Sequence, residues 1–186
     1  MIKIEDNFLD QKVYDELLPH FIDRAVMSTT PDMTWIYNDA IDYEGDDDKF
    51  QFIHPFYGNC NATSPHITLI DPIIVKLAPM AIYRIKANMI TRTPEIVVNE
   101  FHMDIGGYED CLEKLNYWET SVYYINTNDG YTEFEDGTKV ESVANRMITF
   151  PSKMKHRGTS CTDAKVRIII NFNYFKAPPP PEGYIR

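Results

Sequence analysis

Alternation of apolar and polar residues dominates the chain from residue 80 onward and predicts β-strands rather than helices. Turn-forming pairs rich in Gly, Asn and Asp separate the alternating segments, as expected between antiparallel strands. Eight short strands separated by such turns favour a β-sandwich or jelly roll. The expected strands cover about 80–92, 96–103, 117–126, 131–135, 138–141, 146–150, 153–157 and 165–175.

The first 79 residues have a mixed pattern. An amphipathic helix is expected after Asp10, which is placed as its N-cap, with Val13, Leu17 and Leu18 on one face. A second helix is expected over 71–78, with Asp71 as the cap and Pro72 in the first helical position. Strands are expected at 35–37 and 50–56. We therefore expect a single domain over 1–176, in which 1–79 support a β core over 80–176, and a polyproline II tail over 177–186.

Charge and cysteine content narrow the classes of partner. The 186 residues carry 28 acidic and 18 basic side chains, a net charge of −10, which disfavours non-specific binding to nucleic-acid backbones or anionic membranes. Three cysteines without paired spacing predict reduced thiols and a cytoplasmic location. No apolar run approaches the ~18 residues of a membrane span.

Candidate chemistry begins at His102 and Asp104. Side chains two residues apart on a strand share a face, so both can point into a barrel, where His156 on a facing strand would complete a three-ligand site. Two histidines and one carboxylate on one face of an octahedron suit non-haem Fe(II), because the other face stays open. The alternative for the His-x-Asp pair alone is a histidine that only satisfies a neighbouring carboxylate.

The last strand places polar side chains on its inner face. Arg167, Asn171 and Asn173 share that face with Ile169, because side chains repeat every second residue. A buried guanidinium needs an anionic partner, since an unpaired charge is costly to bury. A dicarboxylate such as 2-oxoglutarate would supply one through a bidentate contact with Arg167. A structural salt bridge to Asp or Glu is the alternative.

Several segments in consistent order over residues 80–176 resemble the 2-oxoglutarate and iron(II) dependent dioxygenases of the prolyl-4-hydroxylase-like branch, above all its small phage-encoded members. They are His102-x-Asp104, Val122-Tyr-Tyr-Ile-Asn126, Gly130-x-Thr132-x-Phe134, Arg146-Met-Ile-Thr-Phe-Pro-Ser152, His156 and Arg167 through Tyr174.

The resemblance implies a mainly β double-stranded β-helix, a cupin-like jelly roll with a few N-terminal supporting helices. It implies a catalytic Fe(II) site of His102, Asp104 and His156. Members use O2 to convert 2-oxoglutarate to succinate and CO2 while hydroxylating a C–H bond, with ascorbate as the expected reductant. The residues expected to bind 2-oxoglutarate are Arg167, Tyr124 and Asn88, and those expected to line the pocket are Asn171, Asn173 and Tyr131.

Two departures from the family pattern leave the substrate open. Collagen-type prolyl hydroxylases have lysine where this chain has Arg167, and the usual Gly-Gly pair appears here as Gly130-Tyr131. We expect a peptide substrate hydroxylated at a prolyl or other residue, with a small molecule or free amino acid as the alternative. A cupin-like metal-binding domain without oxygenase activity is the alternative of another class. A lid over 104–117 and a substrate-mimicking role for the prolines at 178–181 are left open.

Overall fold

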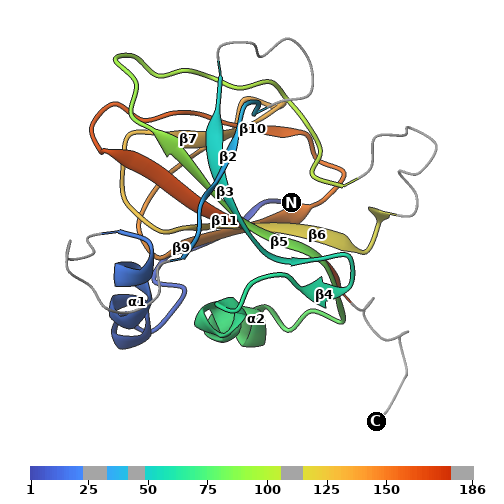
Figure 1. Cartoon of the computed structure of the whole chain (residues 1–186). Helices are drawn as coiled ribbons and strands as arrows, with labels where there is room; N and C mark the ends of the chain where they lie inside the picture. The colour runs from blue at the N-terminus through green and yellow to red at the C-terminus, as the bar shows by residue number, and fades with distance from the viewer. Residues whose placement is uncertain (23–32, 42–48, 106–114, 177–186) are drawn as a thin grey trace.

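The computed structural model describes residues 1–22, 33–41, 49–105 and 115–176, and strands account for most of its regular structure (Figure 1). The Pro-rich tail and all but the ends of the expected 104–117 lid lie outside the described residues. The strands are β1 (Lys3–Glu5), β2 (Ile36–Asn38), β3 (Gln51–Gly58), β4 (Asn61–Ala62), β5 (Ala81–Thr91), β6 (Trp118–Tyr124), β7 (Tyr131–Phe134), β8 (Lys139–Glu141), β9 (Arg146–Pro151), β10 (His156–Gly158) and β11 (Val166–Phe175).

Two antiparallel sheets form a jelly roll. The larger has the order β1-β9-β6-β11-β5-β3-β2, with β4 paired to β3, and the smaller has the order β10-β7-β8. Strands distant in sequence are neighbours, as when β11 pairs with both β5 and β6. This crossed connectivity confirms the expected double-stranded β-helix and brings the inner faces of β5, β6 and β11 opposite the smaller sheet.

Most expected strands are confirmed, but the expected strand over 96–103 is wrong as a continuous ladder. That segment pairs with the chain around β10 only through isolated bridges, Val98 with Thr159 and His102 with His156. Three residues lie between Val98 and His102, whereas two lie between His156 and Thr159. One extra residue therefore interrupts the register, as in a β-bulge, and leaves His102 on an irregular segment beside the smaller sheet.

The strand expected over 153–157 begins only at His156, because residues 152–154 turn instead. The Met154 amide donates to the Pro151 carbonyl over 2.9 Å and closes this turn. His156 is therefore the first residue of β10, at the rim of the smaller sheet.

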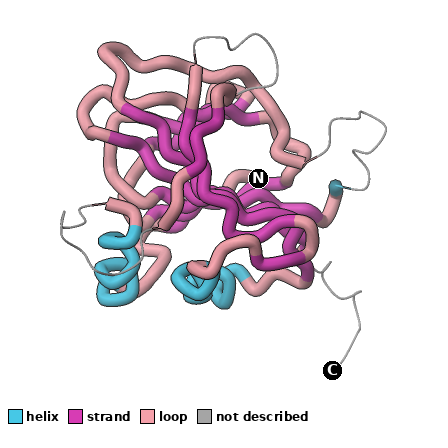
Figure 2. The backbone as a smooth tube through the Cα atoms, viewed as in Figure 1, coloured by secondary structure: helices cyan, strands magenta, loops and turns pink. Residues whose placement is uncertain are grey.

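The two helices lie on the same side of the molecule, away from β7 and β10 (Figures 1 and 2). Helix α1 (Gln11–Leu17) follows Asp10 as expected. Helix α2 (Asp71–Leu77) has Ile70 rather than Asp71 as its N-cap, because a 3-10 turn over Ile67–Ile70 has already curled the chain. No helix among the described residues has the length and apolar character needed to cross a bilayer.

Two apolar clusters lie on opposite faces of the larger sheet. One joins that sheet to the helices and includes Ile168, Ile170, Phe172 and Tyr174 of β11. The second lies on the inner side and includes Tyr124, Phe134, Phe150 and Ile169. Strand β11 thus alternates between them, and its other inner positions, Arg167, Asn171 and Asn173, are polar and buried. Polar side chains fill part of the space between the sheets, and this is where the candidate site lies.

Candidate metal and carboxylate-binding site

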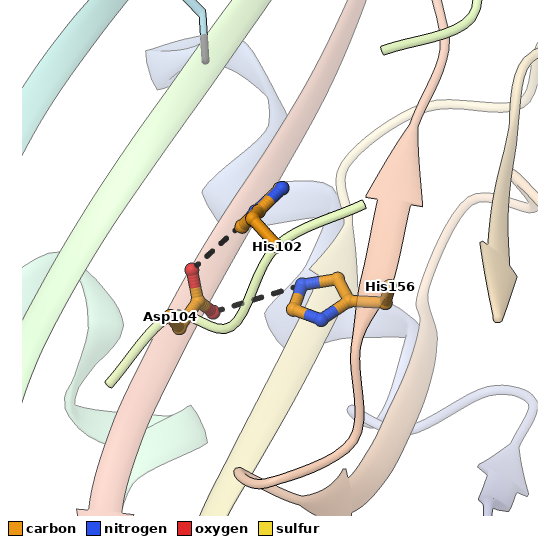
Figure 3. A group of neighbouring side chains, drawn as sticks. All are labelled: His102, Asp104 and His156. Atoms are coloured by element: carbon orange, nitrogen blue, oxygen red, sulfur yellow. Dashed lines mark ion pairs between the residues drawn. The ribbon is translucent and has the colours of Figure 1, made fainter. Parts of the chain in front are cut away.

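His102, Asp104 and His156 come together at the rim of the jelly roll (Figure 3). The Nε2 atoms of His102 and His156 each lie 3.9 Å from a different carboxylate oxygen of Asp104, and the three ligand atoms are within 4.8 Å of one another. A small shift of these side chains would let one divalent ion contact all three. Two imidazoles and a carboxylate are the donor set of non-haem Fe(II) sites, so the residues present fit such an ion.

Backbone carbonyls orient both imidazoles. Nδ1 of His102 lies 3.2 Å from the Glu100 carbonyl, and Nδ1 of His156 lies 3.4 Å from the Met154 carbonyl. A carbonyl only accepts, so each contact favours the proton on Nδ1 and leaves the lone pair on Nε2, which faces Asp104. The rings therefore present the nitrogen that a metal requires.

Asp104 is held in its ionised form although its side chain is only 5% exposed. Burial by itself would raise its pKa, but attraction to His156, Arg84 and His102 and a hydrogen bond from Asn173 outweigh it, so the pKa lies below its usual value. Arg84 donates to Asp104 Oδ1 over 3.2 Å, and Asn173 Nδ2 donates to Oδ2 over 3.0 Å. Burial lowers the pKa of His156 although the nearby Asp104 carboxylate opposes this, so burial favours the neutral ring.

Arg167 lies deeper between the sheets and is 1% exposed. Its Nε donates to Ser142 Oγ over 2.8 Å and its Nη2 donates to Thr132 Oγ1 over 3.3 Å. Within the described part of the chain it forms no ion pair with a carboxylate, which disfavours the structural salt bridge weighed above. Neutral hydroxyls orient the guanidinium but do not neutralise it.

Close packing at Gly130 makes room for Arg167. A Cβ at Gly130 would lie 2.6 Å from the Ser160 carbonyl oxygen and 2.7 Å from Arg167 Cδ, too close for any other residue without displacement. Gly130 is therefore required by the close approach of both the Ser160 carbonyl and the Arg167 side chain rather than by an unusual backbone angle.

One cavity joins the metal-binding cluster to Arg167. Its lining includes His102, Asp104, His156, Arg167 and, from β5 and β11, Lys86, Asn88 and Asn171. Asn88 and Asn171 are each 7% exposed, and the Oδ1 atom of each is buried without a hydrogen-bond partner. Unpartnered buried polar atoms are rare in folded proteins, so their clustering here indicates that a polar ligand belongs in the cavity.

The other expected site residues fall in different places. Tyr124 is fully buried beneath the arginine: its ring centre is 5.7 Å from Arg167 Cζ, and its hydroxyl donates to Thr132 Oγ1 over 2.8 Å. Asn173 does not line the cavity, because its side chain points to Asp104 and donates a hydrogen bond to that carboxylate.

Tyr131 also does not line the cavity. The alternation along β7 turns Thr132 inward, so Tyr131 packs against Lys139, with the Lys139 ammonium 4.5 Å from the ring centre. Thr132 therefore occupies the lining position that was expected for Tyr131.

Sequence reasoning missed Arg84, Lys86, Thr132 and Ser142. A sequence pattern could have identified Arg84 and Lys86. Polar residues at 84, 86 and 88 alternate along β5 with the apolar residues Ile85, Ala87 and Met89. Register pairs them with Asn173, Asn171 and Ile169 of β11. Thr132 belonged to the Gly130-x-Thr132-x-Phe134 segment but was given no role, and nothing local in the sequence marked Ser142, because both roles arise from contact with Arg167.

Comparison with known proteins identifies the fold. No family model and no curated protein matches the sequence. Among solved structures, a prolyl hydroxylase from Trichoplax adhaerens, in complex with a hypoxia inducible factor oxygen degradation domain peptide fragment, is similar with a TM-score of 0.52 and 14% identity, over 94% of this chain and 83% of that one. OsALKBH1 is similar with a TM-score of 0.51 and 10% identity, over 92% and 96%. This chain therefore shares its jelly-roll fold with these two structures.

Proposed function

We propose that this protein is a non-haem Fe(II) and 2-oxoglutarate dependent dioxygenase that hydroxylates a C–H bond, with a prolyl or other peptidyl residue as substrate. The observation that carries the proposal is one cavity with two ends. The His102, Asp104 and His156 cluster lies near Asn173 of β11, and the buried guanidinium of Arg167, six residues earlier on that strand, has no carboxylate partner among the described residues. A metal at the cluster and a dicarboxylate spanning the cavity would satisfy both.

The chain's own residues would bind and orient the co-substrate. The Arg167 guanidinium would donate two hydrogen bonds to the 2-oxoglutarate carboxylate that lies farther from the metal. Ser142 and Thr132 orient this guanidinium by accepting hydrogen bonds from it. Thr132 Oγ1 already accepts hydrogen bonds from Tyr124 and Arg167, so its own proton can be donated into the cavity. Bound Fe(II) would supply O2 activation coupled to the decarboxylation of 2-oxoglutarate.

The metal ligands would be ready in the protonation states that binding requires. The pKa values of His156 and Asp104 are both lowered, which favours a neutral ring and an ionised carboxylate, and Arg84 and Asn173 restrict rotation of that carboxylate. A pre-oriented ligand set loses less conformational freedom on binding the ion.

The peptidyl substrate is supported by the likeness to a prolyl hydroxylase that was solved with a peptide. A small molecule or free amino acid stays the alternative substrate, because residues outside the barrel set substrate choice on this fold. The alternative of a cupin-like metal-binding domain without oxygenase activity offers no reason for a buried, uncompensated Arg167. Phage origin, cytoplasmic location and the use of ascorbate stay predictions.

Succinate release tests the proposed reaction. Protein supplied with Fe(II), ascorbate and 2-oxoglutarate should form succinate, and His102→Ala and Asp104→Ala should abolish it. His66→Ala is the matched control, because His66 lies outside the cavity lining. Full turnover by both ligand variants, or no succinate from the wild-type protein, would contradict the proposal. Proline-rich peptides compared with free amino acids then separate the two substrate classes.

A further inference from the structure

Lys86 is a second cation in the cavity and has no role in the site described so far. It lies on the inner face of β5, in register with Asn171 of β11, and both side chains line the cavity. The described residues provide Lys86 with no ion pair and no hydrogen bond. Burial and then the neighbouring charge of Arg84 lower its pKa, against the opposing effect of Asp104. The half-buried Lys86 ammonium group therefore has no close anionic partner among the described residues.

The facing amide is also unsatisfied. Asn171 Oδ1 is buried without a partner, and its Nδ2 makes no hydrogen bond to any described residue. Asn88, the next inner residue of β5, has the same unpartnered oxygen. The two unpartnered amide oxygens are acceptors and would not contact an anion, so the donors available to an anion here are the Lys86 ammonium and the Asn171 Nδ2 group.

This cationic position is distinct from Arg167. In the β5–β11 register Arg167 pairs with Ile90, whereas Lys86 pairs with Asn171. The two pairs are four residues apart along each strand, or about 13 Å of backbone at the usual rise per residue. Arg84, two residues before Lys86 on the same face of β5, donates to Asp104 Oδ1 over 3.2 Å, which places the lysine toward the metal-binding end. One carboxylate could not neutralise both cations.

We propose that Lys86 and Asn171 form a second carboxylate-binding subsite, at the metal-binding end of the cavity. The inference deepens the proposed function and rests on it. The carboxylate has two candidate sources: the 2-oxo acid end of the co-substrate, or an acid group of the primary substrate, which would then be an anionic compound or a free amino acid. Either source would present a carboxylate to the Lys86 ammonium, and binding measurements distinguish the two sources.

The first measurement is calorimetric titration of 2-oxoglutarate into Mn(II)-loaded protein without oxygen. If the co-substrate supplies the carboxylate, Lys86→Met should weaken binding by about tenfold or more, the loss of one charged hydrogen-bonded contact. Lys86→Arg should restore part of the affinity because it keeps the charge. Lys12→Met, an exposed lysine on α1, is the matched control and should bind as the wild type does.

The second measurement uses protein already saturated with Mn(II) and 2-oxoglutarate. A panel of free amino acids and their neutral amides is then titrated. If the primary substrate supplies the carboxylate, the wild type should bind acids more tightly than the matching amides. Lys86→Met should lose that preference while its 2-oxoglutarate affinity stays within about twofold of the wild type. The subsite does not exist if Lys86→Met binds 2-oxoglutarate as the wild type does and also leaves the preference for acids unchanged. The same conclusion follows if the wild type shows no preference for acids and Lys86→Met binds 2-oxoglutarate normally.

Thermal unfolding of the ligand-free protein shows whether the Lys86→Met variant is folded. Lys86→Met removes an uncompensated charge and should raise Tm by about 2–4 °C. A fall in Tm for Lys86→Met, with binding normal in Lys86→Met and Lys86→Arg, would show a structural lysine and overturn the subsite. These binding and melting results do not require turnover, so an absence of succinate would contradict the dioxygenase activity without deciding the subsite.

Discussion

Asn173 Nδ2 donates a hydrogen bond to Asp104 Oδ2 over 3.0 Å, joining the last strand to a carboxylate 69 residues earlier. Asn173 also donates to Thr120 and accepts from Arg84, so its amide is fixed from three directions. The metal-binding carboxylate therefore depends on the inner face of the larger sheet for its orientation.

Removing this support should weaken metal binding without unfolding the protein. Asn173→Ala should lower Mn(II) or Fe(II) affinity about 10–100-fold, the usual effect of losing a residue that orients a ligand. Metal titration by calorimetry in the absence of oxygen measures it. Asn61→Ala, at an exposed position on β4, should bind metal normally. Unchanged affinity in Asn173→Ala would mean that Arg84 alone orients the carboxylate.

Gly130 gives a steric test of the Arg167 end. Gly130→Ala should displace Arg167 together with the chain at Ser160, because the added methyl would lie 2.7 Å from Arg167 Cδ and 2.6 Å from the Ser160 carbonyl oxygen. We expect about 1–3 kcal/mol of destabilisation, typical of overpacking, and weaker 2-oxoglutarate binding. Gly58→Ala is a matched control, since nothing lies within 4 Å of its added Cβ. Equal 2-oxoglutarate affinity in both variants would contradict the placement of the arginine.

Thr132 Oγ1 connects Tyr124 to Arg167 by accepting from both. Thr132→Val should destabilise the protein by about 1–3 kcal/mol, because two buried donors lose their acceptor. Adding Tyr124→Phe should cost less in the Thr132→Val background than in the wild type, since one orphaned donor is then removed. A double-mutant cycle by urea unfolding measures the coupling, and strictly additive effects would show that the two hydroxyls do not interact.

The inner face of β11 was predictable because the period of two is a property of the pleat itself. Placing Arg167 inward placed Asn171 and Asn173 inward with it. What Asn173 then contacts was not predictable, because its contact with Asp104 depends on how a distant irregular segment lies over the sheet.

The expected strand over 96–103 was wrong for a related reason. A single extra residue breaks its pairing, and composition does not reveal a bulge. On β7 the choice between Tyr131 and Thr132 depends on register, which a one-residue slip reverses. Alternation thus identifies which side chains share a face, whereas the packing of the sheets decides which face is inside.

Buried tyrosines should control the alkaline limit of stability. Burial raises the pKa of Tyr14, Tyr123, Tyr124 and Tyr174 above the ordinary value near 10. Because the folded pKa is raised, the folded state favours the neutral phenol, so this contribution is complete below about pH 10 and is lost as the pH rises further.

The free energy of unfolding should therefore fall above about pH 10. Near-ultraviolet absorbance should show these four tyrosines ionising only together with the loss of ellipticity. Tyr123→Phe removes one buried phenol, which donates to Asn145 over 2.8 Å. It should lower stability at neutral pH, because Asn145 loses that donor, and should make unfolding less dependent on alkaline pH. Ionisation of all twelve tyrosines in a single step without unfolding would contradict the burial of these side chains.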